Sequence, residues 1–335
     1  MGRWMSNRAK RPGRRSRRIL AVVLAVAAAV LCFVVDRSGG QGSVPCWEDL
    51  YQVFGLEPGT AALVEGQTSV TFLDVGQGDS VLVLQDGSAC LIDAGPYNAR
   101  DALAETLAAR GVDQIDLLVM THPHADHIGG MPSVLAQCEV KTLLLPALGD
   151  SDSDGSLVRR VLEQARAQGT ELVRAEDGME LPVGNGTLTV LSAGFAPEES
   201  SSDDPENDSS LCLQFRAGTF TFLDTGDAER DAEADLLARY GSDLRSTIFK
   251  AGHHGSSTSN TEAFLRAVNP VLVTASCGQD NDYGHPHREV VERLASLDIP
   301  LYRTDRDGSV TVTVSGQELS VLTTRTGGES ILPAA

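Results

Sequence analysis

Two stretches of the chain repeat one pattern, and this repeat limits the folds that the sequence can adopt. "SVLVLQDGSACLIDAG" (80–95) and "SLCLQFRAGTFTFLDTG" (210–226) each run from a serine through two strand-like segments to Asp-x-Gly. In each copy a histidine follows the aspartate by 29 residues, from Asp93 to His122 and from Asp224 to His253. Two such ββαβ halves predict two sheets packed face to face with helices outside, and both halves place histidines at one edge.

Strand and helix signals alternate from residue 68 onward, in agreement with this arrangement. "SVTFLDV", "DSVLVLQ" and "IDLLVM" predict strands, and "ARDALAETLAARG" predicts a helix that ends at Gly111. A hairpin, "SVTVTVSGQELSVLTT", closes the pattern. We therefore expect an α/β fold, a four-layer αββα sandwich, over residues 67–326, with a tail at 327–335. Further helices are expected at 155–168, 228–240, 260–268 and 287–296, and further strands at 187–192, 210–216 and 219–224.

The N-terminal segment differs from the rest in charge and hydropathy. Residues 1–18 carry eight Lys or Arg and no acid, and 19–35 is an unbroken run of seventeen apolar residues. We predict a single-pass membrane anchor at 19–35, favoured over a signal peptide because the run is long and no small-residue cleavage site follows it. The basic end then stays in the cytoplasm and the body lies outside, or is secreted if the segment is cleaved. Residues 36–66, rich in Gly and Pro, predict a linker.

The body of the chain is strongly acidic. Beyond residue 18 it has 19 Lys or Arg and 46 Asp or Glu, a balance of −27. Such a body repels polyanions at long range unless metal ions reverse the field near a site, which counts against a tight, non-specific nucleic-acid binder. The most acidic run, "PEESSSDDPENDSS" (197–210), is expected to be a solvated surface loop.

All seven histidines lie in three short motifs, "THPHADHIGG", "GHHGS" and "YGHPH". A structural role would scatter imidazoles along the chain, so the clustering indicates chemistry. His122 and His124 follow a buried strand at i and i+2, a spacing that sends both side chains the same way, as two ligands of one metal require. Asp126 and His127 lie where a helix begins and face a different point. One segment can therefore supply two neighbouring metal sites, an arrangement that suits phosphate-ester hydrolysis.

Eight motifs occur in order over about residues 68–315: "FLDVGQGDSVLV", "LIDAGP", "THPHADHIGGM", "NDSSLCLQF", "FLDTGD", "KAGHHGSSTS", "NDYGHPH" and "YRTDRDGSV". Together they resemble the extracellular metallo-hydrolase domain of the ComEC DNA-uptake proteins, within the metallo-β-lactamase superfamily. This resemblance implies the αββα sandwich that the repeat suggests. Phosphorylcholine esterases of cell-wall teichoic acid share much of the same motif set, so the family alone does not fix the substrate.

The resemblance implies a site with two divalent metal ions, zinc or manganese. His122 and His124 match ligands of the first metal, and Asp126 and His127 match ligands of the second. Asp227 in "DTGD" matches the carboxylate that bridges both metals, with a helix N-cap as the alternative role for this residue.

Further matching positions concern the support of the site and the completion of its two metal sites. Asp93 matches an aspartate that buttresses the site through hydrogen bonds, and one of His253 and His254 completes the second metal, with the choice left open. Residues 128–252 lack the third histidine that many superfamily members supply to the first metal. An Asn-x-x-Ser pattern stands there instead, with candidate residues Asn207, Asp208 and Ser210. A site richer in oxygen would shift selectivity from zinc toward manganese.

Several side chains outside the ligand motifs are candidates for contact with the substrate or for support of the site. His285 could contact a phosphate oxygen or protonate the leaving alkoxide, or it could be a loop histidine that only pairs locally. Lys250 could neutralise phosphate charge, with a solvated lysine as the alternative. Supporting roles, including a tight turn in "DVGQGD" beneath the site, are expected for Asp74, Gln77, Asp79 and Ser256.

The sequence thus predicts an extracytoplasmic, metal-dependent hydrolase that cleaves phosphodiester bonds with a metal-activated hydroxide. DNA is the favoured substrate by resemblance only, and no protein partner is predicted. Two alternatives remain open. One is a phosphoesterase of cell-wall or lipid headgroups, which the acidic body favours. The other is a non-catalytic module that binds nucleic acid or a partner, against which the clustered ligands argue.

Overall fold

The computed structural model describes residues 67–146, 156–195, 200–316, 318–325 and 329–333. The predicted basic N-terminus, anchor and linker lie outside these residues. Within them, no helix is both long and apolar enough to span a bilayer.

Within the described residues, a nine-stranded sheet contains the strands between Thr68 and Arg174 together with β14, β15 and β16. Its strand order is β16-β15-β14-β1-β2-β3-β4-β5-β6, antiparallel from β16 to β3 and parallel from β3 to β6. The bounds are β1 Thr68–Phe72, β2 Val81–Gln85, β3 Ser88–Ile92, β4 Gln114–Val119, β5 Glu139–Leu145, β6 Glu171–Arg174, β14 Val310–Ser315, β15 Glu318–Thr323 and β16 Glu329–Pro333.

A seven-stranded sheet contains most of the second half. Its order is β13-β12-β11-β10-β9-β8-β7, antiparallel from β7 to β10 and parallel from β10 to β13. The bounds are β7 Glu180–Val183, β8 Gly186–Ser192, β9 Cys212–Ala217, β10 Phe220–Asp224, β11 Ile248–Lys250, β12 Leu272–Ala275 and β13 Leu301–Arg303.

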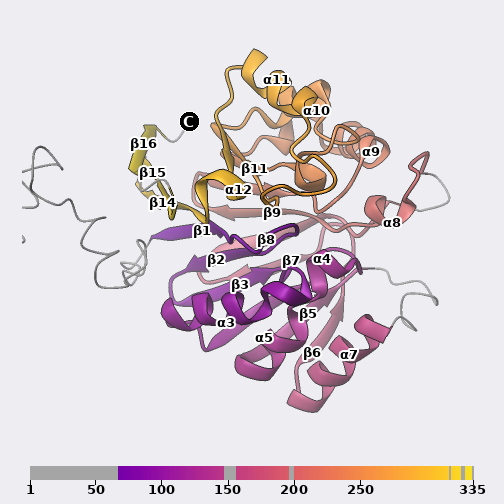
Figure 1. Cartoon of the computed structure of the whole chain (residues 1–335), viewed down its shortest axis with the longest axis vertical. Coiled ribbons are helices and arrows are strands. Elements are labelled where there is room, and N and C mark those ends of the chain that lie inside the picture. The colour runs from indigo at the N-terminus through magenta and orange to yellow at the C-terminus, as the bar shows by residue number, and fades with distance from the viewer. Residues whose placement is uncertain (1–66, 147–155, 196–199, 317, 326–328, 334–335) are drawn as a thin grey trace, which may run out of the picture. The chain divides into compact units, whose positions relative to one another are not determined.

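Helices cover the outer face of each sheet (Figure 1). One group packs on the first sheet: α3 (Arg100–Ala109), α5 (Met131–Gln137) and α7 (Ser156–Gln168). The other group packs on the second: α9 (Arg230–Tyr240), α10 (Glu262–Val268) and α11 (Arg288–Ser296). A third core lies between the sheets, where Phe72 meets Phe222 edge to face at 5.6 Å. The predicted four-layer sandwich is therefore confirmed.

Strands in the middle of each sheet, such as β2 and β11, are apolar on both faces. In β2, Val81 and Val83 join the core between the sheets, whereas Leu82 joins the core under the helices. Side chains alternate between the faces of a strand, so a strand covered on both sides needs the continuous run "VLVL". β11 follows the same rule: Ile248 faces the other sheet and Phe249 faces the helices. Lys250 lies two residues after Ile248, so its side chain also points toward the first sheet.

The predicted ββαβ repeat is present in both halves, as β2-β3-α3-β4 and β9-β10-α9-β11. β3 pairs in parallel with β4, and β10 pairs in parallel with β11. The carboxyl ends of neighbouring parallel strands meet at one edge, so the loops that follow these four strands lie together. The motifs "THPHADHIGG" and "GHHGS" lie in those loops, and "YGHPH" lies after β12, which pairs in parallel with β11.

Two regions differ from the sequence-based expectation. The expected tail at 327–335 contains β16, which pairs antiparallel with β15 and extends the first sheet. The acidic run at 197–210 is not simply solvated, because it contains the short helix α8 (Pro205–Asp208), in which Asn207 and Asp208 are buried. Charge composition alone did not show that the end of this run packs against the site.

Candidate metal centre

The carboxylate of Asp227 lies among four imidazoles. Its Oδ2 atom is 3.2 Å from Nε2 of His127, 3.3 Å from Nε2 of His254, 3.8 Å from Nε2 of His253 and 3.9 Å from Nε2 of His122. Asp227, His122, His127 and His254 are buried, and His253 is half-buried. The structure thus brings together ligand candidates from both halves of the repeat.

Tight local geometry holds Asp227 in this place. It follows β10, and its backbone N–H donates to Ser210 Oγ at 3.0 Å. Gly226 precedes it with φ +53°, and a Cβ atom there would lie 2.8 Å from the Cβ of Ser210. Only glycine allows this approach without displacing Ser210. Asp227 is not a helix N-cap, because α9 begins at Arg230 and is preceded by Glu229 in the cap position.

His127 and His254 each use Nδ1 in a hydrogen bond and present Nε2 to Asp227. Nδ1 of His127 lies 2.7 Å from Asp93 Oδ2, and Nδ1 of His254 lies 3.0 Å from the carbonyl oxygen of Ser276. A carbonyl oxygen and an ionised carboxylate only accept, so both Nδ1 atoms carry the proton. The lone pair of each Nε2 is then available to a metal, as in a metal-bound histidine oriented by a second group.

His122 follows the same arrangement through Thr121. Thr121 Oγ1 donates to Asp93 Oδ2 at 2.6 Å, so it accepts from Nδ1 of His122 at 3.1 Å. Asp93 also accepts from the backbone N–H of Thr121 at 3.0 Å. The contacts of Asp93 agree with the buttressing role expected for it. Its buried carboxylate orients the imidazole of His127 directly and that of His122 through the hydroxyl of Thr121.

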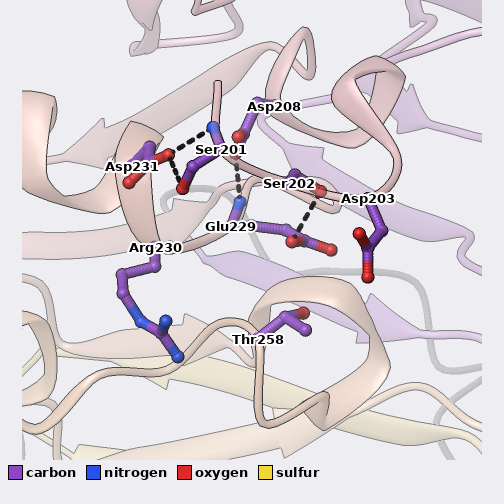
Figure 2. A pocket seen from close by; sticks show the side chains of 8 residues that line it. All are labelled: Ser201, Ser202, Asp203, Asp208, Glu229, Arg230, Asp231 and Thr258. Carbon is purple, nitrogen blue, oxygen red and sulfur yellow. Dashed lines mark hydrogen bonds between the residues drawn. The ribbon is translucent and has the colours of Figure 1, made fainter. Parts of the chain in front are cut away.

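His253 is oriented by the carboxylate of Glu229, the residue that precedes α9. Its Nδ1 lies 3.1 Å from Glu229 Oε1, while Ser202 Oγ donates to Glu229 Oε2 at 2.8 Å. Figure 2 shows the bond between Ser202 and Glu229 in a small pocket beside the centre, where the backbone N–H of Glu229 also donates to Asp208 Oδ1 at 2.7 Å. Asp208 thus supports the loop around His253 and is not placed with the ligand candidates.

The turn that carries His253 and His254 is strained and firmly held. Both residues have positive φ, 49° and 54°, which is uncommon for a residue other than glycine. The buried side chain of Asn260 holds the turn at both ends: Oδ1 accepts from Gly252 N at 3.0 Å, and Nδ2 donates to Gly252 O and Ser256 O at 2.9 and 3.1 Å. Such strain, of order 1–3 kcal/mol per residue, is typical of functional sites. Sequence reasoning did not identify Asn260.

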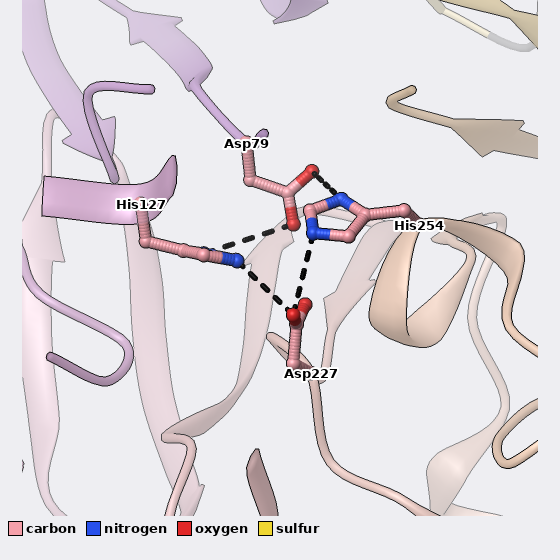
Figure 3. Close-up of side chains that lie close together, drawn as sticks. All are labelled: Asp79, His127, Asp227 and His254. Atoms are coloured by element: carbon pink, nitrogen blue, oxygen red, sulfur yellow. Dashed lines mark ion pairs between the residues drawn. The ribbon is translucent and has the colours of Figure 1, made fainter. Parts of the chain in front are cut away.

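Four buried side chains form the closest group around a point in this centre (Figure 3). Their ligand atoms all lie within 4.8 Å of one another, and the residues are Asp79, His127, Asp227 and His254. Each has a buried atom that makes no hydrogen bond of good geometry within the described residues: Asp79 Oδ1, His127 Nε2, Asp227 Oδ1 and His254 Nε2. The two Nε2 atoms make only the ion-pair contacts to Asp227 Oδ2 given above. Leaving such atoms unsatisfied costs about 1–3 kcal/mol each. Neighbouring ligand atoms on one tetrahedral metal lie about 3.3 Å apart, so the separations around Asp227 Oδ2 fit a divalent cation.

Asp79 shows the clearest difference between the sequence-based site and the structure. The sequence assigned it to a tight turn beneath the site, whereas its carboxylate lies in the buried group itself. Gly78 makes this possible: its φ is +144°, and a Cβ atom there would lie 2.2 Å from the backbone oxygen of Asp126. The glycine lets the "DVGQGD" turn come close to the histidine segment, and this is the sequence signal that could have identified Asp79.

Lys250 is buried and faces Asp79, not a substrate. Its Nζ lies 2.6 Å from Asp79 Oδ2 and 3.7 Å from Asp224 Oδ1, and it donates to Gly226 O at 3.2 Å. Burial would lower the pKa of Lys250, but Asp79 and Asp224 raise it well above the ordinary value. The lysine therefore balances carboxylate charge inside the protein, which differs from the expected contact with phosphate.

Acidic groups dominate the electrostatics of the centre. Burial lowers the pKa of a histidine, yet Asp227 and Asp93 raise that of His127 well above its usual range, and Asp227 and Asp79 do the same for His254. The buried carboxylates thus stabilise positive charge at these two imidazoles. A divalent cation bound at the two Nε2 atoms would supply this positive charge in place of the Nε2 protons.

His124 and Asp126 lie at the solvent side of the centre. Nδ1 of His124 is 3.1 Å from Nε2 of His122, so the two imidazoles converge as the i, i+2 spacing predicts. Nε2 of His124 lies 3.1 Å from Glu206 in α8. Asp126 Oδ2 is 3.2 Å from Nε2 of His254. Burial raises the pKa of Asp126, but His254 and His127 lower it to about 2, so this carboxylate is ionised at neutral pH.

A cavity of about 320 Å³ opens beside these residues. Among the described residues its lining contains no Lys or Arg. It consists of Gln77, His124, Ala125, Asp126, Asp204, Asn207, Asp227, His253, His254, Tyr283 and His285.

His285 lines this cavity as a neutral imidazole. Burial first, and then His254 and His253, lower its pKa to about 3. Its buried Nδ1 has no hydrogen-bond partner among the described residues. At neutral pH His285 can donate or accept a hydrogen bond, but it lacks the second proton that the expected transfer to a leaving alkoxide requires.

The remaining predicted site residues have supporting positions. Asn207 lines the cavity, and its buried Oδ1 has no partner among the described residues. Gln77 also lines it and accepts from Gly278 N at 3.1 Å. Ser256 is buried and bonds Thr258 within the "GHHGS" turn. Asp74 pairs with Arg325 at 2.6 Å outside the centre and accepts from Gly76 N within the predicted tight turn.

Comparison with known proteins defines the class. The family model of the metallo-beta-lactamase superfamily matches residues 73–278, more than half of the chain. With a two-sheet sandwich and a histidine-rich centre at its edge, the chain belongs to the metallo-beta-lactamase superfamily.

Within that class, the chain is homologous to competence proteins, as the motif order implied. It is 32% identical over 291 residues to competence protein ComA of Neisseria gonorrhoeae, covering 86% of this chain and 38% of that protein. It is 30% identical over 265 residues to ComE operon protein 3 of Bacillus subtilis (strain 168), covering 74% and 33%. The chain therefore spans about a third of the length of these relatives.

A solved structure shares the fold. CmlA, a diiron beta-hydroxylase from Streptomyces venezuelae, matches with a TM-score of 0.51 and 18% identity, covering 80% of this chain and 59% of CmlA. This likeness concerns the fold alone.

Proposed function

We propose that the chain is a metal-dependent hydrolase of phosphodiester bonds. The observation that carries the proposal is the position of Asp227 Oδ2 within 3.9 Å of four imidazole Nε2 atoms at the wall of a cavity. A bridging carboxylate between histidine-rich ligand sets suits a pair of divalent cations. When bound, such cations supply an activated hydroxide and polarise the phosphoryl oxygen.

Two ligand sets meet at Asp227 in this proposal. His122 and His124 would hold one cation. His127 and His254 would hold the other, together with Asp126 or Asp79. Because His254 presents Nε2 at 3.3 Å and His253 at 3.8 Å, we assign the second site to His254 and keep His253 as a neighbour of the substrate. Zinc and manganese both fit this mixture of nitrogen and oxygen ligands.

Other residues around the centre orient the proposed metal ligands or bind the substrate. Asp93 and Ser276 fix the imidazoles, and Ser210 fixes Asp227. His285 and Asn207 line the cavity, and each has a buried polar atom without a hydrogen bond among the described residues, so we place them as groups that hydrogen-bond the substrate. Lys250 takes no part in binding and keeps Asp79 ionised.

We favour DNA as the substrate, since the relatives named above are competence proteins. The membrane anchor at 19–35 and the extracytoplasmic location of the body belong to the same proposal. A phosphoesterase of cell-wall or lipid headgroups is the second candidate. The absence of Lys and Arg from the described cavity lining favours it, because a long polyanion gains no direct attraction there.

One experiment separates the candidates. The full chain, purified in detergent and loaded with zinc or manganese, is incubated with single-stranded DNA, duplex DNA and bis-p-nitrophenyl phosphate. Asp227→Asn should lower turnover by at least about 100-fold, whereas Asp116→Asn, at an aspartate that pairs with Lys141 outside the centre, should not. Diester turnover without DNA cleavage would favour the headgroup esterase. No turnover at full metal occupancy would contradict the proposal.

A further inference from the structure

The lining of the cavity provides little electrostatic attraction for a nucleic acid. Asp126, Asp204 and Asp227 contribute carboxylates to its lining, and the described lining has no Lys or Arg. These carboxylates repel the phosphates that flank a scissile bond, apart from the one that meets the cations. A nucleic-acid substrate must therefore gain its binding energy from another part of the nucleotide.

Tyr283 offers an apolar surface at this point. It lines the cavity, yet its side chain is 67% exposed. Only two other large hydrophobic side chains within the described part of the chain are comparably exposed, Tyr97 and Ile331. One face of the Tyr283 ring stacks on His285, with a centroid distance of 5.6 Å and an angle of 17° between the rings. A flat aromatic group from a substrate can stack on the exposed ring.

This stack connects directly with the metal centre. The His285 ring lies 5.4 Å from that of His253 and 5.9 Å from that of His254. Tyr283 is therefore separated from the proposed ligands by a single imidazole. A base on Tyr283 would belong to a nucleotide beside the phosphate at Asp227.

The loop that carries Tyr283 is held in place although the ring is exposed. Asn281 Oδ1 accepts from His285 N at 2.9 Å, and its Nδ2 donates to His285 O at 2.7 Å and to Gly278 O at 2.8 Å. Nε2 of His287 lies 3.1 Å from the carbonyl oxygen of Tyr283. A fixed platform loses little conformational entropy on binding, which favours a binding role.

We propose that Tyr283 is a base-stacking residue that makes the site select single-stranded nucleic acid, an inference that rests on the proposed phosphodiesterase function. Stacking accepts any base, and it needs no basic side chain. A base paired and stacked inside a duplex is not free to lie on Tyr283, so a single strand binds more tightly than a duplex. Tyr283 binds and positions the substrate; it does not touch the reacting atoms.

The test measures binding with the full, metal-loaded chain. The probe is a phosphorothioate-linked oligothymidylate of about ten nucleotides that carries one 2-aminopurine, whose fluorescence is quenched by stacking. The variants are Tyr283→Phe, which keeps the ring, and Tyr283→Leu, which keeps apolar bulk without it. Tyr97→Leu is the matched control, because Tyr97 is 56% exposed but does not line the cavity.

The expected result is quenching by the wild type, Tyr283→Phe and Tyr97→Leu. Tyr283→Leu should lose the quenching and bind roughly 5- to 150-fold more weakly. An abasic probe should bind the wild type as weakly as the thymidylate probe binds Tyr283→Leu. Equal binding and quenching by Tyr283→Leu and the wild type, or wild-type binding that does not distinguish single strand from duplex, would overturn the inference.

Turnover and binding measurements separate a failure of the proposed function from a failure of the role of Tyr283. Turnover of bis-p-nitrophenyl phosphate that disappears in Asp227→Asn supports the function whatever Tyr283 does. If that turnover is absent, the function fails, while the comparison of binding by Tyr283→Phe and Tyr283→Leu still decides the role of the ring.

Discussion

Lys250 Nζ lies 2.6 Å from Asp79 Oδ2, and the two side chains are 1% and 2% exposed. Lys250 comes from β11 of the second sheet, and Asp79 comes from the loop before β2 of the first. This ion pair therefore joins the two sheets directly behind the proposed metal ligands. Asp224, 3.7 Å from the same ammonium, makes the group a buried cation between two carboxylates.

Removal of the Lys250 ammonium group alone should strongly destabilise the folded protein. Lys250→Met leaves Asp79 and Asp224 without their buried partner, and breaking such a pair typically costs about 3–5 kcal/mol. Urea unfolding in the presence of a chelator should show this loss. The double variant Lys250→Met/Asp79→Asn should be more stable than Lys250→Met, because one uncompensated charge is gone. A double variant whose loss equals the sum of the two single losses would show that the pair is not coupled.

The carboxylate that orients His127 should control metal affinity. Asp93→Asn keeps the shape of the side chain but removes the charge that faces Nδ1 at 2.7 Å, so affinity for zinc or manganese should fall about 10- to 100-fold. Asp93 has a φ of 56°, a conformation that asparagine tolerates. The matched control is Asp86→Asn, at a φ of 46° in the β2–β3 turn. Competition with a chromophoric chelator measures the affinity, and equal values for Asp93→Asn and the wild type would exclude this role.

Metal loading should stabilise the fold. At a free metal concentration of about 100 times the Kd, binding adds about 2.7 kcal/mol, which corresponds to a rise in Tm of roughly 5–10 °C for a domain of this size. Differential scanning fluorimetry with and without a chelator measures the rise. Asp227→Asn should lose most of it, because its carboxylate is common to all four imidazoles. A rise of the same size in that variant would place the metal elsewhere.

Glu233 should make stability depend on pH. It is fully buried in α9, and burial raises its pKa from 4.5 to about 7, although the N–H groups of Thr261 and Asn260 act against this. The folded state therefore binds the proton more tightly than the unfolded state. This contribution to stability is complete below about pH 4.5 and is lost as the pH rises through about 7, a change on the order of 3 kcal/mol.

Unfolding free energies of the wild type and Glu233→Gln, measured from acid to mildly alkaline pH, test this. The stability of the wild type relative to the variant should decrease across that window, because the amide does not titrate. Glu289→Gln, at an exposed position in α11, is the control. A wild-type advantage that stays constant with pH would show that Glu233 remains ionised in the folded state.

The architecture could be predicted from the sequence because its central strands are covered on both faces. Runs such as "VLVL" in β2 and the repeated Asp-x-Gly turns mark the two halves without knowledge of any contact. β6, β7, β13 and β16 were not predicted. They are three to five residues long, and segments of that length show too little periodicity to distinguish a short strand from a loop.

The positions of the proposed ligands could be predicted where these residues are close in sequence, and not where their positions depend on tertiary contacts. The convergence of His122 and His124 follows from local spacing. Asp79 reaches the centre only through the close approach at Gly78, and the direction of Lys250 depends on the parity of β11. Glu206 lies beside His124 because an acidic run folds back over the site, which charge composition does not show.

The group in Figure 3 draws on both halves of the repeat, with Asp79 and His127 from the first and Asp227 and His254 from the second. During synthesis His254 is the last of the four to emerge, more than 170 residues after Asp79. A ribosome-bound chain that ends before this histidine holds only an incomplete set of donors. The proposed centre can thus assemble only after both halves of the repeat have been synthesised and have docked.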